Sequence, residues 1–297
     1  MNSTLDPNAM AGRVCLVTGA TSGIGKATAT SLAAQGAEVI VTGRNQRKAD
    51  DTVSWIKSET GNKAVRYLLA DFADLGQVRD LARALNEQTS QLDVLVNNAG
   101  AFFNTRRETP YGVEMTFLVN HLAPFLLTNL LLETLREGVS ARIVNVTSAA
   151  HQYDSMNFDD LGFKRGYAGM KAYARSKLAN LLFTYELSRR LDGSQVTANA
   201  LHPGHVATDM WKTNFPVIGP TLKWVMGFFA LTPEQGADTA IYLASSPEVE
   251  GFTGLYFADR EAVQSSPLSY DEGVAQRLWQ ISEELTRLQQ MAAGAGT

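Results

Sequence analysis

The chain has 297 residues, of which 45% are hydrophobic, and its formal net charge is −4. No basic run resembles a nucleic-acid footprint, and no uninterrupted apolar stretch reaches the ~20 residues that span a bilayer. Residues 1–10 are polar and lack the apolar segment of a secretory signal. The single cysteine, Cys15, cannot form an intrachain disulfide, which fits a reducing compartment. We therefore expect a cytoplasmic protein that does not bind nucleic acid.

Short apolar runs alternate with helix-like segments along the chain. The expected strands cover residues 13–18, 38–42, 64–70, 92–96, 141–147, 195–201 and 254–257. The expected helices cover residues 24–35, 46–59, 75–89, 109–136, 167–191, 232–244 and 269–291. Pro124 should bend the fourth of these helices. This alternation is typical of a parallel sheet that is covered by helices on both faces.

The predicted fold class is therefore α/β, with a doubly wound parallel sheet of the Rossmann type. No linker or repeat divides the chain, so we expect a single dinucleotide-binding and catalytic domain over residues 1–297. Ligands of such sheets bind beyond the carboxyl ends of the strands. Within this domain, residues 205–232 are predicted to form a substrate lid and residues 266–292 a C-terminal helix.

A glycine-rich segment, Thr18-Gly19-Ala20-Thr21-Ser22-Gly23-Ile24-Gly25, follows the first predicted strand. A tight turn there lets backbone N–H groups approach a pyrophosphate, and the helix N-terminus adds partial positive charge. A plain strand–helix turn would explain one glycine but not three. The predicted cofactor-binding residues of this segment are Thr18, Gly19, Ser22, Gly23, Ile24 and Gly25.

Tyr173 and Lys177 lie four residues apart on a predicted helix and so share one face. A free tyrosine has a pKa of ~10, which is too high for efficient acid–base chemistry near neutrality. A nearby ammonium group should lower that pKa. Ser148, at the end of the fifth predicted strand, can hydrogen-bond a substrate oxygen and stabilise charge that develops there. Thr147 takes this role if the register slips by one residue.

Four motifs in this order resemble the short-chain dehydrogenase/reductase family. They are Thr18-Gly-xxx-Gly-x-Gly, Asn97-Asn98-Ala99-Gly100, Ser148 and Tyr173-xxx-Lys177, and the resemblance covers residues 12–256. It implies an NAD(P)-dependent oxidoreductase that acts on CH–OH or C=O groups. Tyr173 would be the general acid/base, with Ser148, Lys177 and Asn120 as the other catalytic residues. Asn120 would bend its helix and hold a water in a proton relay to Lys177.

The residues after the second predicted strand bear on the choice between NADP and NAD. An acidic residue there would hold the ribose hydroxyl and repel a 2′-phosphate. This chain has Thr42-Gly43-Arg44-Asn45 instead, with no carboxylate before Asp50. Arg44 can bind a phosphate bidentately, or it can be a solvated residue at a helix start. We predict NADP as the cofactor, with NAD as the alternative.

The resemblance implies further cofactor contacts. Asp71 would bind the adenine, although a capping or loop-stabilising role is the physical alternative. Lys177 would also hold the nicotinamide ribose. Asn97, Ala99 and Gly100 would support the adenosine-ribose side and the central strand. The remaining predicted contacts, near the nicotinamide, are Pro203, Gly204, Val206 and Thr208. No metal site is expected, because the four histidines lack metal-ligand spacing. Of these, His151 is interpreted as a solvated loop residue, with a substrate contact as the alternative.

Twenty-four residues separate Ser148 from Tyr173, and this insert resembles the retinol-dehydrogenase-like branch of the family. The branch implies a lipophilic alcohol or carbonyl substrate. Residues 215–231 are apolar with a single charge, Lys223, which suits a lid over the nicotinamide. A subunit interface, plain core or a transient membrane contact are the alternatives for this segment. We also expect a homo-oligomer.

Two other functions compete with this interpretation. One is a 3-oxoacyl or sugar-type carbonyl reductase, which the apolar lid disfavours. The other is a cofactor-binding regulatory protein that has lost turnover. The complete set of Ser148, Tyr173 and Lys177 argues against the second.

Overall fold

The computed structural model describes residues 6–204 and 231–287. Within these ranges one sheet has the strand order β3-β2-β1-β4-β5-β6-β7-β8, and every neighbouring pair is parallel except β7 and β8. The strands are β1 Val14–Val17, β2 Glu38–Gly43, β3 Val65–Leu69, β4 Val94–Asn97, β5 Arg142–Val146, β6 Thr197–His202, β7 Tyr256–Ala258 and β8 Glu261–Val263. The predicted doubly wound α/β sheet is confirmed. Strand β8 was not predicted from the sequence, because it has only three residues, all of them exposed.

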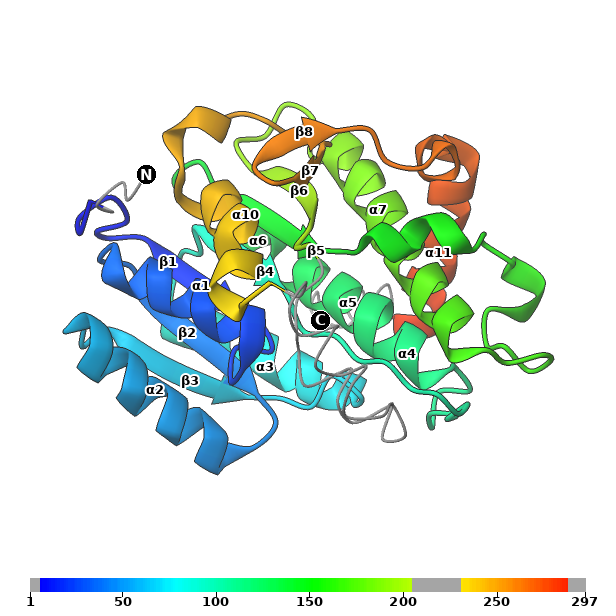
Figure 1. Cartoon of the computed structure of the whole chain (residues 1–297), viewed down its shortest axis with the longest axis horizontal. Coiled ribbons are helices and arrows are strands. Elements are labelled where there is room, and N and C mark those ends of the chain that lie inside the picture. Colours follow the sequence, from blue (N-terminus) through cyan, green and yellow to red (C-terminus); the bar gives the residue numbers. More distant parts are fainter. Residues whose placement is uncertain (1–5, 205–230, 288–297) are drawn as a thin grey trace, which may run out of the picture.

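Helices cover both faces of the sheet (Figure 1). The helices longer than ten residues are α1 Gly23–Ala34, α2 Gln46–Thr60, α3 Leu75–Gln88, α7 Gly169–Arg190, α10 Pro233–Ser245 and α11 Glu272–Thr286. The shorter ones are α4 Met115–Phe117, the π-helical η1 Leu118–Leu122, α5 Ala123–Leu130, α6 Leu132–Arg136 and the 3₁₀ turns η2 Ala149–Tyr153, η3 Phe158–Asp160, η4 Pro247–Val249 and η5 Pro267–Tyr270.

Both faces of the sheet are buried, which explains the uninterrupted apolar runs of its strands. Along β1, Val14 and Leu16 pack into a cluster with residues of α3, α5 and α7. Cys15 and Val17 point the other way, into a cluster with α1, α2 and α10. Cys15 is fully buried, and burial raises the pKa of its thiol. Cys15 is therefore a small core residue rather than a reactive thiol.

The prediction of one helix over residues 109–136 was wrong. Thr109 and Val113 close a turn through a backbone hydrogen bond of 2.9 Å. Helix then begins at Met115, because the Glu114 carboxylate caps it by accepting from the Phe117 N–H (3.0 Å). The irregularity that was expected at Pro124 is the π-helical segment η1 immediately before α5. Such single π turns occur often at functional sites.

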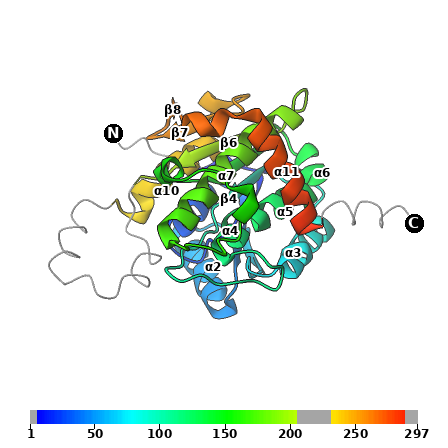
Figure 2. The same ribbon diagram turned by 90° about the vertical axis from the view of Figure 1, so that its right-hand side faces the viewer.

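Helix α11 packs on α7 and α5 through aromatic side chains, and lies outside them in the rotated view (Figure 2). The Trp279 ring centroid lies 5.0 Å from that of Phe125 and 5.8 Å from that of Phe183. The predicted segment 266–292 is helical only from Glu272, because η5 and the capping residue Asp271 precede it. The last described helical residue is Thr286. No helix within the described ranges is both long and apolar enough to span a membrane.

His121, on η1, joins this interface through a hydrogen bond with Ser282 (Nε2 to Oγ, 2.9 Å). The Ser282 hydroxyl donates its own proton to the Leu278 carbonyl (2.7 Å), so Nε2 of His121 carries a proton. Burial lowers the pKa of His121 from 6.5 to about 3. The ring is therefore neutral in the folded protein at every pH above that value.

This burial predicts acid sensitivity. Below pH 6.5 the unfolded chain protonates His121 and the folded chain does not, so stability falls as the pH falls. This group alone should lower the free energy of unfolding by about 2 kcal/mol between pH 7.5 and pH 5. His121→Phe should reduce the pH dependence of urea unfolding by that amount. An equal pH dependence in both proteins would contradict the assignment, whatever the variant's stability at pH 7.5.

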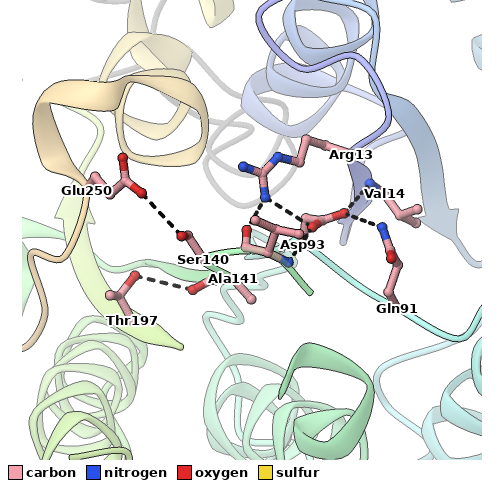
Figure 3. A network of polar contacts seen from close by, with 9 residues as sticks. Arg13, Val14, Gln91, Asp93, Ser140, Ala141, Thr197 and Glu250 are labelled. Carbon is pink, nitrogen blue, oxygen red and sulfur yellow. Dashed lines mark hydrogen bonds and ion pairs between the residues drawn. The ribbon is translucent and has the colours of Figure 1, made fainter. Parts of the chain in front are cut away.

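A polar network holds the amino ends of the strands, opposite the carboxyl edge (Figure 3). The buried Asp93 carboxylate accepts from the backbone N–H groups of Val14 (2.8 Å) and Val139 (3.0 Å) and pairs with Arg13 (3.2 Å). Ser140 donates to Glu250 beside it (3.2 Å). No residue predicted for the site takes part, so this network is structural.

Candidate active site

The glycine loop packs directly against the loop that follows β4. The Thr18 hydroxyl accepts from the backbone N–H groups of Asn98 and Ala99, both at 3.0 Å. Gly19 has φ +62°, and a Cβ there would lie 2.8 Å from the Ala99 Cα. A Cβ on Gly25 would lie 2.4 Å from the Asn98 amide nitrogen. These two positions therefore require glycine for close packing.

The N-terminus of α1 opens at this loop. Ser22 occupies the N-cap position, but its side chain makes no capping hydrogen bond. Gly23 has φ +55° and Ile24 is buried, so the loop turns sharply into the helix. The first N–H groups of a helix have no partner within the helix. A pyrophosphate fits this uncapped, glycine-lined helix start.

Arg44 and Asp71 lie together at the ends of β2 and β3. The Arg44 guanidinium is 3.9 Å from the Asp71 carboxylate, and the Arg44 side chain is 75% exposed. An exposed pair of this kind contributes little stability, so Arg44 is available to an anionic ligand. The other Asp71 oxygen accepts from the Ala73 N–H (3.0 Å). This hydrogen bond supports the alternative that Asp71 stabilises its own loop.

The Asn97 side chain supports the central strand, as predicted. Its side chain points into the interior, where the amide nitrogen donates to Thr128 (2.9 Å) and to Asn145 (2.8 Å). Asn145 donates in turn to Thr184 on α7 (2.9 Å). Asn97 thus braces β4 against β5 and two helices. Its partners lie far along the chain, so local sequence could not show this orientation.

Helix α7 places Tyr173 and Lys177 at the end of β5. The Lys177 ammonium donates to the Val146 carbonyl (3.0 Å), two residues before Ser148. The Thr147 hydroxyl is used in packing, since it donates to the Lys177 carbonyl (2.8 Å). A hydrogen bond joins Ser148 and Tyr173. The structure therefore brings Ser148, Tyr173 and Lys177 together, and Thr147 is excluded as a replacement for Ser148.

The pKa values in this cluster are set by burial. Burial raises the pKa of Tyr173 to about 12, with a smaller opposing effect from the hydrogen bond with Ser148. Burial lowers the pKa of Lys177 to about 8. The expected lowering of the tyrosine pKa by the lysine is therefore not found in the protein alone. The Lys177 nitrogen lies 5.5 Å from the Tyr173 ring centroid and donates to a carbonyl instead.

Asn120 is buried on η1, next to the cluster. Its Oδ1 accepts from the Ala101 N–H (2.7 Å), and its amide nitrogen donates to the Ala101 carbonyl (3.0 Å) and to Ser176 (2.9 Å). Both amide hydrogens are thus in use. A Cβ on Gly100 would lie 3.5 Å from Asn120 Oδ1 and 3.8 Å from Lys177 Nζ. Gly100 therefore lies within contact distance of both groups.

The structure describes only part of the predicted nicotinamide end. Gly204 follows β6 with φ +77°, and a Cβ there would lie 2.4 Å from a methyl carbon of Leu231. Pro203 is half-buried beside it. Val206, Thr208 and the predicted lid up to residue 230 lie outside the described residues. Thr232, which ends the predicted lid, belongs to the capping box of α10 with Gln235.

Sequence analysis missed Arg175, which holds the insert between Ser148 and Tyr173 against α7. Its guanidinium pairs with Asp154 (3.0 Å), donates to the Asp160 carbonyl (2.8 Å) and lies 3.7 Å from the Phe163 ring centroid. Arg175 is only 6% exposed. A buried arginine usually has specific partners, so its position between the two motif residues was the available signal.

His151 is neither solvated nor open to substrate, so both interpretations from the sequence were wrong. It is fully buried and packs edge-on against Tyr256 (ring centroids 5.3 Å apart). No cluster of three or more His, Cys, Asp or Glu side chains in the described part of the chain could hold a metal ion.

A doubly wound sheet, a glycine loop at its carboxyl edge and a Ser–Tyr–Lys cluster at the same edge define a nicotinamide-dependent oxidoreductase of the Rossmann class. Residues 13–217 match the family model described as short chain dehydrogenase, and the chain belongs to that family. The predicted family, and with it an enzyme that acts on alcohol or carbonyl groups, is confirmed.

Related proteins extend this assignment. The chain is 43% identical to human retinol dehydrogenase 14, over 95% of this chain and 89% of the relative. It is 43% identical to human polyprenol dehydrogenase, over 92% and 85% of the two chains. These relatives support the predicted retinol-dehydrogenase-like branch.

Two solved structures are also similar. An uncharacterized protein from Mycobacterium paratuberculosis has a TM-score of 0.76 and 35% identity, over 93% of this chain and 94% of that one. A short chain dehydrogenase from Escherichia coli CFT073, complexed with NADPH, has a TM-score of 0.68 and 26% identity, over 84% and 98%.

Proposed function

We propose that the protein catalyses NADP(H)-dependent interconversion of a lipophilic alcohol and its carbonyl compound, with Tyr173 as general acid/base. The observation that carries this proposal is the clustering of Ser148, Tyr173 and Lys177 at the carboxyl edge of the sheet, where Tyr173 and Lys177 are buried and Ser148 is half-buried. A turnover-deficient regulatory protein would not need these three groups at one place.

The chain's own groups fit a dinucleotide. The α1 N-terminus and the loop of Gly19, Gly23 and Gly25 would hold the pyrophosphate, and Arg44 a 2′-phosphate. When bound, the nicotinamide supplies or accepts the hydride. The NADPH of the Escherichia coli structure supports NADP as the cofactor, with NAD as the alternative.

Tyr173 would donate its proton to the carbonyl oxygen in reduction and remove a proton from the alcohol in oxidation. Ser148 would donate a hydrogen bond to the same oxygen and stabilise charge that develops on it. The phenolate must then be stabilised, because burial alone raises the pKa of Tyr173 to about 12. The Lys177 ammonium and the positive charge of an oxidised nicotinamide would both act in that direction.

Proton exchange with solvent would pass through Lys177 toward Asn120. The Asn120 amide hydrogens are already bound to protein groups. The proton relay would therefore use the oxygen atoms of Asn120. Pro124 has no N–H and so cannot donate to the Asn120 carbonyl four residues earlier. A water held at this carbonyl would lie next to the catalytic cluster.

The substrate class rests on the relatives and on the chain's insert. Retinol and polyprenol, in the names of two relatives, are both long lipophilic alcohols. The contacts of Arg175 with Asp154 and with the Asp160 carbonyl would hold the insert in place beside Tyr173. A broader carbonyl reductase remains the second candidate function.

A substrate panel tests the proposal. Long-chain and short-chain alcohols, aldehydes and ketones would be assayed with NADP(H) and NAD(H) by the nicotinamide absorbance near 340 nm. We expect turnover of lipophilic compounds with NADP(H). Tight NADPH binding without turnover across the panel would favour the regulatory alternative, and preference for short polar carbonyls would refute the substrate class.

Arg44→Asp should move the cofactor preference from NADP toward NAD by about 10-fold or more, because a charge-assisted contact becomes a repulsion. The ratio of kcat/KM values for the two cofactors measures this. Arg47→Asp, in the first turn of α2 and also exposed, is the matched control and should leave the ratio near that of the wild type. An unchanged ratio in Arg44→Asp would remove Arg44 from phosphate binding.

A further inference from the structure

His151 connects the turn that carries Ser148 to the segment before α11. Its Nδ1 lies 2.7 Å from the Ser148 carbonyl oxygen, and its Nε2 lies 3.0 Å from the Ser266 backbone nitrogen. The side chain is fully buried between these two partners. The histidine thus bridges residues more than a hundred positions apart in the sequence.

The partners fix the state of the ring. The Ser266 backbone N–H can only donate, so Nε2 of His151 is the acceptor and carries no proton. The Ser148 carbonyl can only accept, so Nδ1 carries the proton. His151 is therefore neutral and held in one tautomer. Burial also lowers the pKa of His151, which agrees with a neutral ring.

The bridge acts on the backbone of a predicted catalytic residue. The Ser148 carbonyl accepts a second hydrogen bond from the His151 N–H (3.1 Å), which closes the η2 turn. The Ser148 hydroxyl oxygen also accepts from the Ala150 N–H in this turn (3.2 Å). The direction of the Ser148 side chain toward Tyr173 therefore depends on the geometry of η2.

The far end of the bridge is anchored on α7, the helix of Tyr173. The Ser265 hydroxyl bonds with Tyr185 of α7 (2.7 Å) and with Ser269 (2.6 Å). The Ser269 hydroxyl donates to the Ser266 carbonyl (2.6 Å). Through this segment, His151 ties the Ser148 turn to the helix that carries the acid/base.

We propose that His151 is a positioning residue: its neutral ring holds the Ser148 turn in register with α7, so that the Ser148 hydroxyl meets Tyr173 and the substrate oxygen. This inference rests on the proposed oxidoreductase function. It does not require His151 to touch substrate or cofactor.

Variants at this position separate the two hydrogen bonds. His151→Phe removes both and should lower kcat by about 10-fold or more, since small displacements of a catalytic group are costly. The NADPH dissociation constant should stay near that of the wild type. His151→Asn keeps a donor near the Nδ1 position and should recover most of the lost kcat. An Asn variant no better than the Phe variant would overturn the proposal.

A double-mutant cycle distinguishes positioning from a general structural role. If His151 acts through Ser148, adding His151→Phe to Ser148→Ala should lower kcat little further. The inference would be overturned if the fold-losses in kcat of the two single variants multiplied in the double variant. It would also be overturned if His151→Phe kept the wild-type kcat at temperatures well below its melting temperature. An inactive wild type would instead refute the proposed function, so the two failures are distinguishable.

The tautomer has a readout that needs no turnover. In ¹⁵N-histidine NMR spectra at pH 7.5, His151 should show a protonated Nδ1 and an unprotonated Nε2. His121, with its proton on Nε2, provides the opposite pattern as an internal reference. The ¹⁵N signals that disappear in the spectrum of His151→Phe are those of His151. A protonated Nε2 on His151 would contradict the bridge.

Discussion

Replacing Tyr173 with phenylalanine is expected to lower kcat by a factor of at least about 100, while the affinity for NADPH stays almost unchanged. The phenyl ring can keep the edge-to-face contact with Phe102, whose centroid lies 5.9 Å away. Only the hydroxyl is lost, and with it the hydrogen bond with Ser148 and the transferable proton. Steady-state kinetics and a fluorescence titration with NADPH measure the two quantities separately.

Tyr242→Phe is the matched control for this variant. Tyr242 lies on α10, on the other face of the sheet, and its hydroxyl interacts with Glu248. Removing that hydroxyl should leave kcat within about twofold of the wild type, because surface substitutions away from a site have small effects. A Tyr173→Phe enzyme as active as this control would remove Tyr173 from the chemistry.

Replacing Gly19 with alanine should weaken NADPH binding by about 10- to 100-fold. The new methyl group would lie 2.8 Å from the Ala99 Cα, so the glycine loop must move away from the β4 loop. Backbone N–H groups aimed at the pyrophosphate would move with it. Loss of one hydrogen bond to a charged group costs about 1.5–3 kcal/mol, which corresponds to this range.

Gly61→Ala separates this contact from backbone strain. Gly61 also has a positive φ, +71° against +62° for Gly19, but a Cβ there meets nothing within 4 Å. Both variants therefore carry similar left-handed strain. Calorimetric titration with NADPH should show weakened binding only for Gly19→Ala. Equal affinities for the two variants would mean that close packing of the loop is not needed for binding.

The fold was predictable because its signals are local. Strands that are buried on both faces read as apolar runs, and Gly61 and Gly36 mark helix ends by their positive φ. The long helix over residues 109–136 failed for a tertiary reason. A buried carboxylate, Glu114, starts the helix six residues later than expected by capping α4.

The positions of residues whose type the proposed chemistry requires could be predicted from the sequence. The orientations of residues that serve packing could not. The Tyr173 and Lys177 spacing placed both groups on α7 beside Ser148. The inward orientation of Asn97 depends on Thr128 and Asn145, 31 and 48 residues away, and the bridge made by His151 depends on Ser266, 115 residues away. Burial, which the sequence does not show, raises the pKa of Tyr173 to about 12, and the hydrogen bond with Ser148 opposes this only in part.

Hydride is expected to pass directly between the nicotinamide and the substrate carbon, in a reaction that depends on the Tyr173 proton. Single turnover with NADPH deuterated at the transferring position of C4 tests it, using a long-chain aldehyde and mass spectrometry of the product. The wild type should place deuterium on the carbinol carbon, and Tyr173→Phe should form the same product at least about 100-fold more slowly. A deuterium-free alcohol, or equal rates in the two proteins, would contradict the account.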